Sequence, residues 1–504
     1  MKGKDEVMRS SGVLMHISSL PSPYGIGTMG KEARKFADFL EKSGQKYWQI
    51  LPICPTSYGD SPYQSFSSFA GNPYFIDLEY LCKEKLLKKA ECESFPWGKK
   101  ADKVDYGVMY ESRYKLLKIA FERFLRAEPD DFEAFCEKEA DWLSDYALFM
   151  AVKDRFDGVA WNEWAEDIRL RWSNAMDYYR RELYYEIEFY SYLQFVFMKQ
   201  WKKLKNYANI NGIEIIGDIP IYVAFDSADA WANPELFQFD AENLPTAVAG
   251  CPPDGFSADG QLWGNPLYRW DYHRETGFDW WIRRIAYCSE LYDVVRIDHF
   301  RGFDEYYSIP YGDTTARNGH WEKGPGIALF EAAKNRLGEL NIIAEDLGYI
   351  TDSVKKLVAD SGFPGMKVLE FAFDSREKSD YLPYTYEKNS VVYTGTHDNE
   401  TIAGWYAGLD KSDLKMCTDY MNIDRIPGKE YHWDFIRLAM LSVSDLCVIP
   451  IQDYLGLDNR ARINHPSTLG TNWRWRLAKG QLSASLLKEI REMTRISGRL
   501  QNGE

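Results

Sequence analysis

The sequence predicts an α/β protein folded as a (β/α)8 TIM barrel, and three observations carry that prediction. Eight short apolar runs rich in β-branched residues recur along the 504 residues, stretches with helical spacing separate them, and several runs end in acidic residues. Alternating strands and helices indicate a parallel sheet, and eight such units close a barrel. The alternative is a doubly wound open sheet, which would normally carry a glycine-rich ligand motif near its first strand, and none is obvious.

The first two strands show the repeat most clearly. The run 12–19 is followed by a helical stretch, 31–43, and then by the run 47–53, which together make one βαβ unit. Stretches such as 351–360 and 433–442 supply further helices. The other six expected strands, in chain order, are 213–223, 294–302, 342–348, 366–374, 391–400 and 446–453.

Between the second and third strands the pattern becomes helical over about 81–210. Leu116, Leu117, Ala120 and Phe124 fall at helical spacing within it. This segment is too long for a connection in a compact fold. We therefore expect a mainly helical insertion subdomain within one catalytic barrel domain, 1–504, and we interpret its aromatic residues as core.

Two loops carry more aromatic residues than a connection needs. The first, 58–73, is rich in Gly, Pro and Ser and also contains Tyr58, Tyr63 and Phe66. The second, 249–268, follows the third strand, and its Gly and Pro density predicts no regular structure. The aromatic residues of the second loop, Trp263 among them, favour an active-site lid that folds over a ligand.

Composition narrows the function. The net charge of −15 makes nucleic acid or an anionic membrane surface an improbable partner, and no apolar run is long enough to span a bilayer. The first residues contain no secretory signal, and the eight cysteines form no C-x-x-C pair, so we expect a cytoplasmic location. Aromatic residues make up 15% of the chain, with 17 Trp and 34 Tyr, which suits a neutral carbohydrate as ligand.

Polar residues gather where the expected strands end. In a barrel, these positions all face one mouth, where such folds place their active sites. Unrelated salt bridges are the alternative, but they do not explain why the pattern recurs in phase on several strands. The residues expected to converge are Asp218, Asp298, Glu345, Asp374 and Asp398, with His299 and His397.

The residue types in this set favour acetal chemistry. No His spacing typical of a metal site and no G-x-S-x-G turn is present, so neither a metal nor a serine nucleophile is expected. Two carboxyls on neighbouring strands can instead attack an anomeric carbon and protonate the leaving oxygen. Asp298, between Arg296 and Arg301, is expected to have a lowered pKa and to be the nucleophile. Glu345, which has no adjacent arginine, fits the acid, and His397 and Asp398 could hold sugar hydroxyls.

Seven motifs resemble a known family. RIDHFRG (296–302), AEDLG (344–348) and THDN (396–399) resemble the α-amylase superfamily of retaining α-glycoside enzymes. The resemblance runs from about Gly12 to Arg476 and narrows to the 4-α-glucanotransferase family, the amylomaltases or disproportionating enzymes. The narrower motifs are SYGDSPYQSFSSFAGNPYFIDLEYL (57–81), IGDIPIYVAFDSADAW (216–231), CPPDGFSADGQLWGNPLY (251–268) and RINHPSTLGTNWRWR (462–476).

The resemblance implies roles for individual residues. Asp298 would be the nucleophile, Glu345 the general acid/base and Asp398 the stabiliser of the transition state. The implied fold has no C-terminal β-sandwich. One departure is the segment 465–468, HPST, where the family commonly has Gly before Thr, which puts the local turn in question. The residues expected to bind substrate are Arg296, His397, Tyr63, Asp218, His299, Gln261, Trp263, Asp374 and Asn464.

The expected reaction is transfer of α-1,4-glucan segments from a donor to an acceptor glucan or glucose. It proceeds through a covalent glycosyl-aspartate, without cofactor or metal, in a monomer. Two alternatives stay open: an α-glucan hydrolase, in which water accepts the glycosyl group, and a catalytically silent glucan-binding protein.

Overall fold

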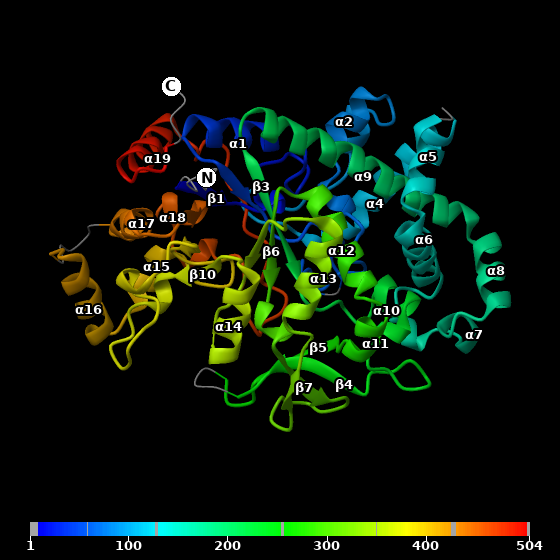
Figure 1. Cartoon of the computed structure of the whole chain (residues 1–504). Coiled ribbons are helices and arrows are strands. Elements are labelled where there is room, and N and C mark those ends of the chain that lie inside the picture. The colour runs from blue at the N-terminus through cyan, green and yellow to red at the C-terminus, as the bar shows by residue number, and fades with distance from the viewer. Residues whose placement is uncertain are drawn as a thin grey trace, which may run out of the picture.

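Eight parallel strands close into a barrel at the centre of the computed structural model (Figure 1). The structure describes residues 9–57, 59–126, 130–253, 257–348, 350–424 and 430–500. The strands pair in the order β1-β12-β11-β10-β9-β6-β3-β2, which confirms the (β/α)8 prediction. They are β1 (Ser10–Leu14), β2 (Tyr47–Gln49), β3 (Glu214–Pro220), β6 (Val294–Asp298), β9 (Ile342–Ala344), β10 (Gly365–Val368), β11 (Ser390–Tyr393) and β12 (Leu446–Pro450).

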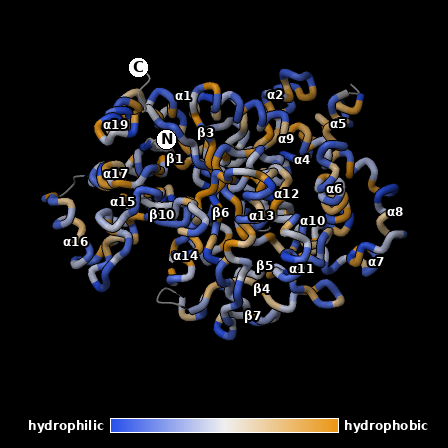
Figure 2. The backbone as a smooth tube through the Cα atoms, in the orientation of Figure 1, coloured by the Kyte–Doolittle hydropathy of each residue, from blue (hydrophilic) through white to orange (hydrophobic). Residues whose placement is uncertain are grey.

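Helices surround the barrel and bury one face each against it. In α1 (Lys31–Lys42), for example, Phe36 and Leu40 are buried one turn apart while the charged residues face outward. Figure 2 shows hydrophobic residues concentrated around β3 and β6 and hydrophilic ones toward the periphery. The other helices that follow this pattern are α12 (Asp279–Leu291), α13 (Ile327–Leu337), α14 (Asp352–Ser361), α17 (His432–Leu441) and α19 (Ala484–Ile496).

A mainly helical segment separates β2 from β3 and forms one side of the molecule (Figure 1). Its last helix, α9 (Tyr184–Ile210), packs on α1 and leads back into β3. The segment therefore stays attached to the barrel at both ends. Its other helices are α2 (Leu78–Lys83), α3 (Lys89–Glu93), α4 (Tyr106–Leu125), α5 (Asp130–Lys138), α6 (Ala140–Arg155), α7 (Glu166–Arg169) and α8 (Ser173–Glu182).

The segment 249–268 is more regular than expected. It contributes to β4 (Ala247–Cys251) and β5 (Gln261–Pro266), which join β7 (Glu305–Pro310) and β8 (His320–Lys323) in an antiparallel sheet of order β5-β4-β7-β8. The prediction of an irregular loop is wrong because its glycines permit the pairing. A Cβ on Gly250 would lie 2.1 Å from the carbonyl oxygen of Gln261, so only glycine allows this approach. Residues 254–256 of the expected lid, like Tyr58 of the first loop, lie outside the described residues.

Several strands end earlier than the sequence suggests. β10 ends at Val368 and is followed by the short helix η6 (Leu369–Phe371), so Asp374 lies beyond the strand end. After β11 come α15 (Ile402–Gly408) and α16 (Lys411–Met421). Past β12, the described residues form α18 (Ile451–Tyr454), η8 (Asn459–Ala461) and α19, with no further strand. None of the helices in the described ranges has the length and apolar character to cross a membrane.

Candidate active site

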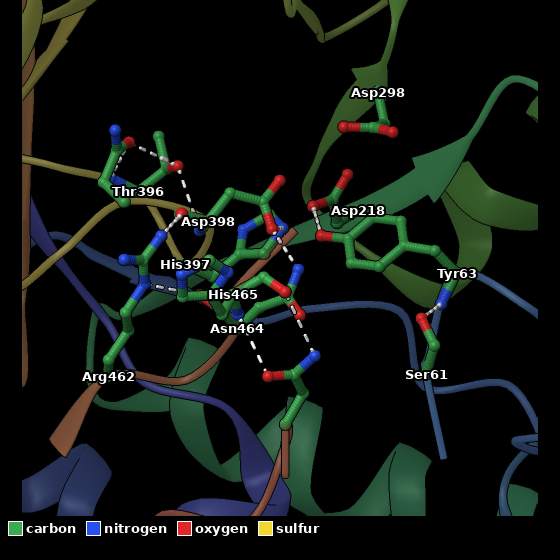
Figure 3. A network of polar contacts seen from close by, with 12 residues as sticks. Ser61, Tyr63, Asp218, Asp298, Thr396, His397, Asp398, Arg462, Asn464 and His465 are labelled. Carbon is green, nitrogen blue, oxygen red and sulfur yellow. Dashed lines mark hydrogen bonds and ion pairs between the residues drawn. The ribbon is translucent and has the colours of Figure 1, made fainter. Parts of the chain in front are cut away.

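A chain of charged groups runs across the barrel mouth from β3 to β6. The strand register places Asp218 beside Arg296, and Nη1 of Arg296 donates to both carboxylate oxygens of Asp218 at 2.7 Å. Nη2 of Arg296 lies 3.0 Å from Oδ1 of Asp298. On the other side, the Tyr63 hydroxyl donates to Oδ2 of Asp218 at 2.7 Å (Figure 3). One buried guanidinium therefore fixes two carboxylates.

The pKa of Asp298 is raised, not lowered as the sequence suggested. Burial raises it to about 6, against the attraction of Arg296. Arg296 is shared with Asp218, whose negative charge also favours the protonated form of Asp298. The expected second guanidinium is engaged elsewhere, because Arg301 stacks 4.1 Å from the ring centre of Trp321.

Glu345 follows β9 and is held by the turn after β6. Its Oε2 accepts the backbone N–H of His299 at 2.6 Å, and its Oε1 accepts that of Leu347 at 2.9 Å. Burial and the negative charge of Asp298 raise the pKa of Glu345 to about 7. The backbone N–H that donates to Glu345 belongs to His299, the residue directly after Asp298. The positions of the two carboxyl groups are therefore fixed relative to one another.

The loop after β11 presents His397 and Asp398. Nε2 of His397 lies 3.4 Å from Oδ1 of Asp398, and Nδ2 of Asn464 donates to the same oxygen at 2.6 Å (Figure 3). Although burial acts in the opposite direction, His397, Asn464 and Arg296 lower the pKa of Asp398 to about 2. Asp398 also raises the pKa of His397, against burial. Asp398 is therefore a permanent carboxylate at neutral pH.

Aromatic rings join the two halves of the site. Tyr63 stacks on His397 with ring centres 5.0 Å apart, and Trp473 lies 5.8 Å from Tyr63 and 5.9 Å from His397. Trp473 was not predicted as a site residue, although it lies within the quoted motif 462–476. The same motif holds Arg462, whose Nη2 donates to the backbone carbonyl of Asp398 at 2.7 Å.

The small antiparallel sheet brings β5 to the site. Trp263 meets His299 edge to face, with ring centres 4.8 Å apart, and its indole N–H donates to Oε1 of Gln261 at 3.0 Å. Tyr222, which sequence reasoning missed, lies 6.3 Å from both rings. His299 is half-buried with its Nε2 covered, and loss of solvent there lowers its pKa to about 3, so the imidazole is neutral.

One predicted site residue stands apart. The partly exposed carboxylate of Asp374 accepts two hydrogen bonds from the Arg376 side chain, at 2.8 and 2.6 Å. Among the described residues, no hydrogen bond or ion pair connects it with the other candidate site residues. Its place beyond β10 accounts for this separation.

The departure from the family pattern at 465–468 falls on a strained turn. Ser467 has a φ of 63°, the left-handed region that favours glycine. The turn is closed by Thr468, whose hydroxyl donates to the carbonyl of His465 at 2.7 Å. Serine therefore keeps the turn that glycine would form more easily.

The fold and the residues at the barrel mouth define an enzyme of the (β/α)8-barrel class, with partly buried, interacting carboxyls at the carboxyl ends of the strands. A family model described as 4-alpha-glucanotransferase matches residues 15–482, and the chain belongs to this family of enzymes.

Relatives across the whole length support this assignment. The 4-alpha-glucanotransferase of Clostridium butyricum is 49% identical over 487 residues, covering 96% of this chain and 100% of that one. That of Thermus thermophilus is 47% identical, covering 98% and 100%. Among solved structures, the amylomaltase from Streptococcus agalactiae in complex with acarbose has a TM-score of 0.95 and 44% identity, covering 97% of this chain and 99% of that one.

Proposed function

We propose that this 4-α-glucanotransferase works by retaining double displacement through a covalent glycosyl–Asp298 ester. The observation that carries the proposal is the hydrogen bond from the His299 backbone N–H to Glu345, next to Asp298. It holds a nucleophile and an acid on adjacent strands, with the pKa of Asp298 at about 6 and that of Glu345 at about 7. Because Arg296 lies 3.0 Å from Asp298 and the two carboxyls repel one another, we take Asp298 as the ionised member of the pair and Glu345 as the protonated one near neutral pH.

In the first step, a carboxylate oxygen of Asp298 attacks the anomeric carbon of the donor glucan. The bond to the departing O4 breaks, and Glu345 gives its proton to that oxygen. The released fragment leaves with a free 4-hydroxyl group, and the rest of the donor stays as an ester on Asp298.

In the second step, Glu345 is a carboxylate and acts as base. It removes the proton from the 4-hydroxyl of an acceptor sugar, whose oxygen attacks the anomeric carbon and displaces the Asp298 carboxylate. Two inversions restore the original configuration, and Glu345 regains its proton for the next turnover.

Asp398 stabilises the positive charge that develops on the sugar ring in both steps. Its low pKa keeps it charged, and Asn464 and His397 fix its position. Arg296 keeps Asp298 oriented. Gln261 and Trp263 lie on β5, the edge strand of the small antiparallel sheet, and would cover a bound glucan. The proposed substrate-binding residues are Arg296, His397, Tyr63, Asp218, His299, Gln261, Trp263 and Asn464.

We propose α-1,4-glucans and maltooligosaccharides as donor and acceptor. The family assignment supports this choice, as does the relative solved with acarbose, an oligosaccharide analogue. We also propose that the protein acts as a monomer.

The product pattern from maltotriose tests the function. Transfer yields glucose and a ladder of longer maltooligosaccharides, while total reducing ends stay nearly constant. Reducing ends that rise in step with maltotriose consumption, with no longer product, would identify a hydrolase. No turnover at all would identify a binding protein.

The covalent step has its own test. Glu345→Gln incubated with maltotriosyl fluoride should accumulate the glycosyl ester, because fluoride leaves without a proton but the second step lacks its base. Intact-mass spectrometry should detect the adduct, and it should be absent in Glu345→Gln combined with Asp298→Asn. An adduct that persists without Asp298 would exclude it as the nucleophile.

A further inference from the structure

The loop that carries His397 and Asp398 is tied at both ends to one buried side chain, Asp453. The loop begins with Thr394, directly after β11, and ends at Ile402, the first residue of α15. The Thr394 hydroxyl donates to Oδ2 of Asp453, and the Ile402 N–H donates to its Oδ1 at 2.8 Å. Asp453 itself lies in α18, directly after β12, the barrel strand that pairs with β11.

We infer that Asp453 is a positioning residue, which fixes the 394–402 loop so that Asp398 meets the reacting sugar. This inference rests on the role proposed for Asp398 above. Asp453 is 1% exposed, so it acts through the loop and not on the substrate. Both of its oxygens are used, one at each end of the same loop.

Hydrogen bonds within the loop stiffen it, so that it can move as one piece. Oδ1 of Asn399 accepts the backbone N–H of Thr396 at 2.9 Å and its hydroxyl at 2.8 Å. The Asp398 N–H donates to the same hydroxyl at 3.3 Å. The segment that holds His397 and Asp398 is thus braced internally, and its position depends on its two ends together with the hydrogen bonds from Arg462 to the Asp398 carbonyl and from the Asn464 N–H to the His397 carbonyl.

The loop borders a small space that side chains do not fill. A cavity of about 10 Å³ lies against it, lined by Thr396, His397 and Asp453 among others. On this side of the loop hydrogen bonds therefore supplement packing, and the loss of an anchor would allow a small displacement of the loop. A displacement of about 1 Å at a reacting centre can cost 100-fold in rate.

The acidic groups near Asp453 indicate which substitution would preserve its hydrogen bonds to Thr394 and Ile402. Glu370 lies beneath the loop, where its Oε1 is 2.7 Å from the position of a Cβ on Gly395. Burial raises the pKa of Asp453 to about 7 and that of Glu370 well above its ordinary value, with Glu400 and Arg462 nearby. Asparagine mimics a protonated Asp453, because its oxygen accepts from Ile402 and its amide donates to the Thr394 oxygen.

The test compares two buried aspartates with the same bonds. Asp77 accepts the Thr28 hydroxyl at 2.7 Å and the Tyr80 N–H at 3.0 Å, in a helix cap of the insertion. Asp453→Ala should lower kcat about 100-fold on both maltotriose and maltotriosyl fluoride, with KM within about threefold. Asp453→Asn should restore kcat to within about fivefold, and Asp77→Ala, assayed below its melting temperature, should keep it within about twofold.

Two further variants keep the inference falsifiable. If Asp453→Ala does not fold, Thr394→Val removes one anchor and should still lower kcat at least tenfold, whereas Thr28→Val should not. Unchanged kcat in Asp453→Ala, or an equal loss in Asp77→Ala, would overturn the positioning role. Failure of the proposed function is recognised separately, since Asp398→Asn would then retain activity.

Discussion

The backbone N–H of His299 donates a 2.6 Å hydrogen bond to Oε2 of Glu345, and the left-handed backbone of His299, φ 55° and ψ 46°, aims it there. This conformation is uncommon for a residue other than glycine and costs about 1–3 kcal/mol. The strained residue thus sits between the proposed nucleophile and the proposed acid.

The turn itself can be tested by substitution at His299. Asparagine tolerates a left-handed backbone, so His299→Asn should keep the alkaline limb of the pH–kcat/KM profile. Valine is β-branched and disfavours it, so His299→Val should move that limb and lower kcat about 10- to 100-fold. An equal loss of activity in the two variants would show that the imidazole and not the backbone is the functional part, and no loss in either would show that neither matters.

The acid role of Glu345 predicts a substrate-dependent loss. Glu345→Gln should lower kcat on maltotriose by about 10²–10⁴-fold, since the leaving oxygen needs a proton. Release of fluoride from maltotriosyl fluoride in the first turnover should fall much less. Equal losses in the two assays would contradict the assignment.

The pH dependence follows from the two coupled carboxyls. Activity needs Asp298 ionised and Glu345 protonated, so kcat/KM should fall as pH drops below about 6 and as it rises above about 7. The apparent values belong to the pair and not to either residue. Asp398, with a pKa of about 2, should not contribute to the acid limb. In Glu345→Gln, the alkaline limb should vanish when fluoride release is measured.

Arg296 should also matter for stability. Its side chain is 4% exposed and that of Asp218 0% exposed, so Arg296→Met leaves buried carboxylates without their cation. We expect the free energy of unfolding to fall by about 3–5 kcal/mol in urea titrations. Arg460→Met, which removes an exposed pair with Asp458, should leave it almost unchanged. A loss in Arg296→Met as small as in this control would contradict the prediction.

The sequence predicted the barrel because eight apolar runs rich in β-branched residues alternate with helical stretches along the chain, which indicates a closed parallel sheet. It placed Asp298, Glu345 and Asp398 at one mouth, since parallel strands share the edge where they end. It could not predict the pKa of Asp298, because burial and the sharing of Arg296 with Asp218 depend on three-dimensional contacts.

Contacts between distant segments also explain why two predictions were wrong: the irregular loop at 249–268 and the placement of Asp374 at a strand end. The glycines near 249–268 suggested a loop, but pairing of β4 with β5 and β7 decides the structure there. The run 366–374 looked like one strand, but the chain turns after Val368. Trp473 escaped prediction because its contacts with Tyr63 and His397 join segments that are distant in sequence.

Transfer should dominate over hydrolysis, and Trp263 should help to decide the ratio. Both reactions use the same ester on Asp298, so the outcome depends on whether a sugar or water reaches it. Water is present at about 55 M, and only a well-positioned acceptor, with an effective molarity of about 10⁵ M or more, competes decisively. Trp263 lies against His299, next to the proposed catalytic carboxyls, and offers a ring on which an acceptor sugar can stack.

Because Gln261 and Trp263 belong to β5, a deletion there would break the sheet, and a point substitution is the cleaner test. Trp263→Ala should raise the ratio of hydrolysis to transfer on maltotriose, measured as reducing ends gained per glucose released. Its neighbour Leu262 is 40% exposed and alternates to the other face of β5, so Leu262→Ala should leave the ratio unchanged. An unchanged ratio in Trp263→Ala would mean that water is excluded by other parts of the site, such as the loop around Tyr63.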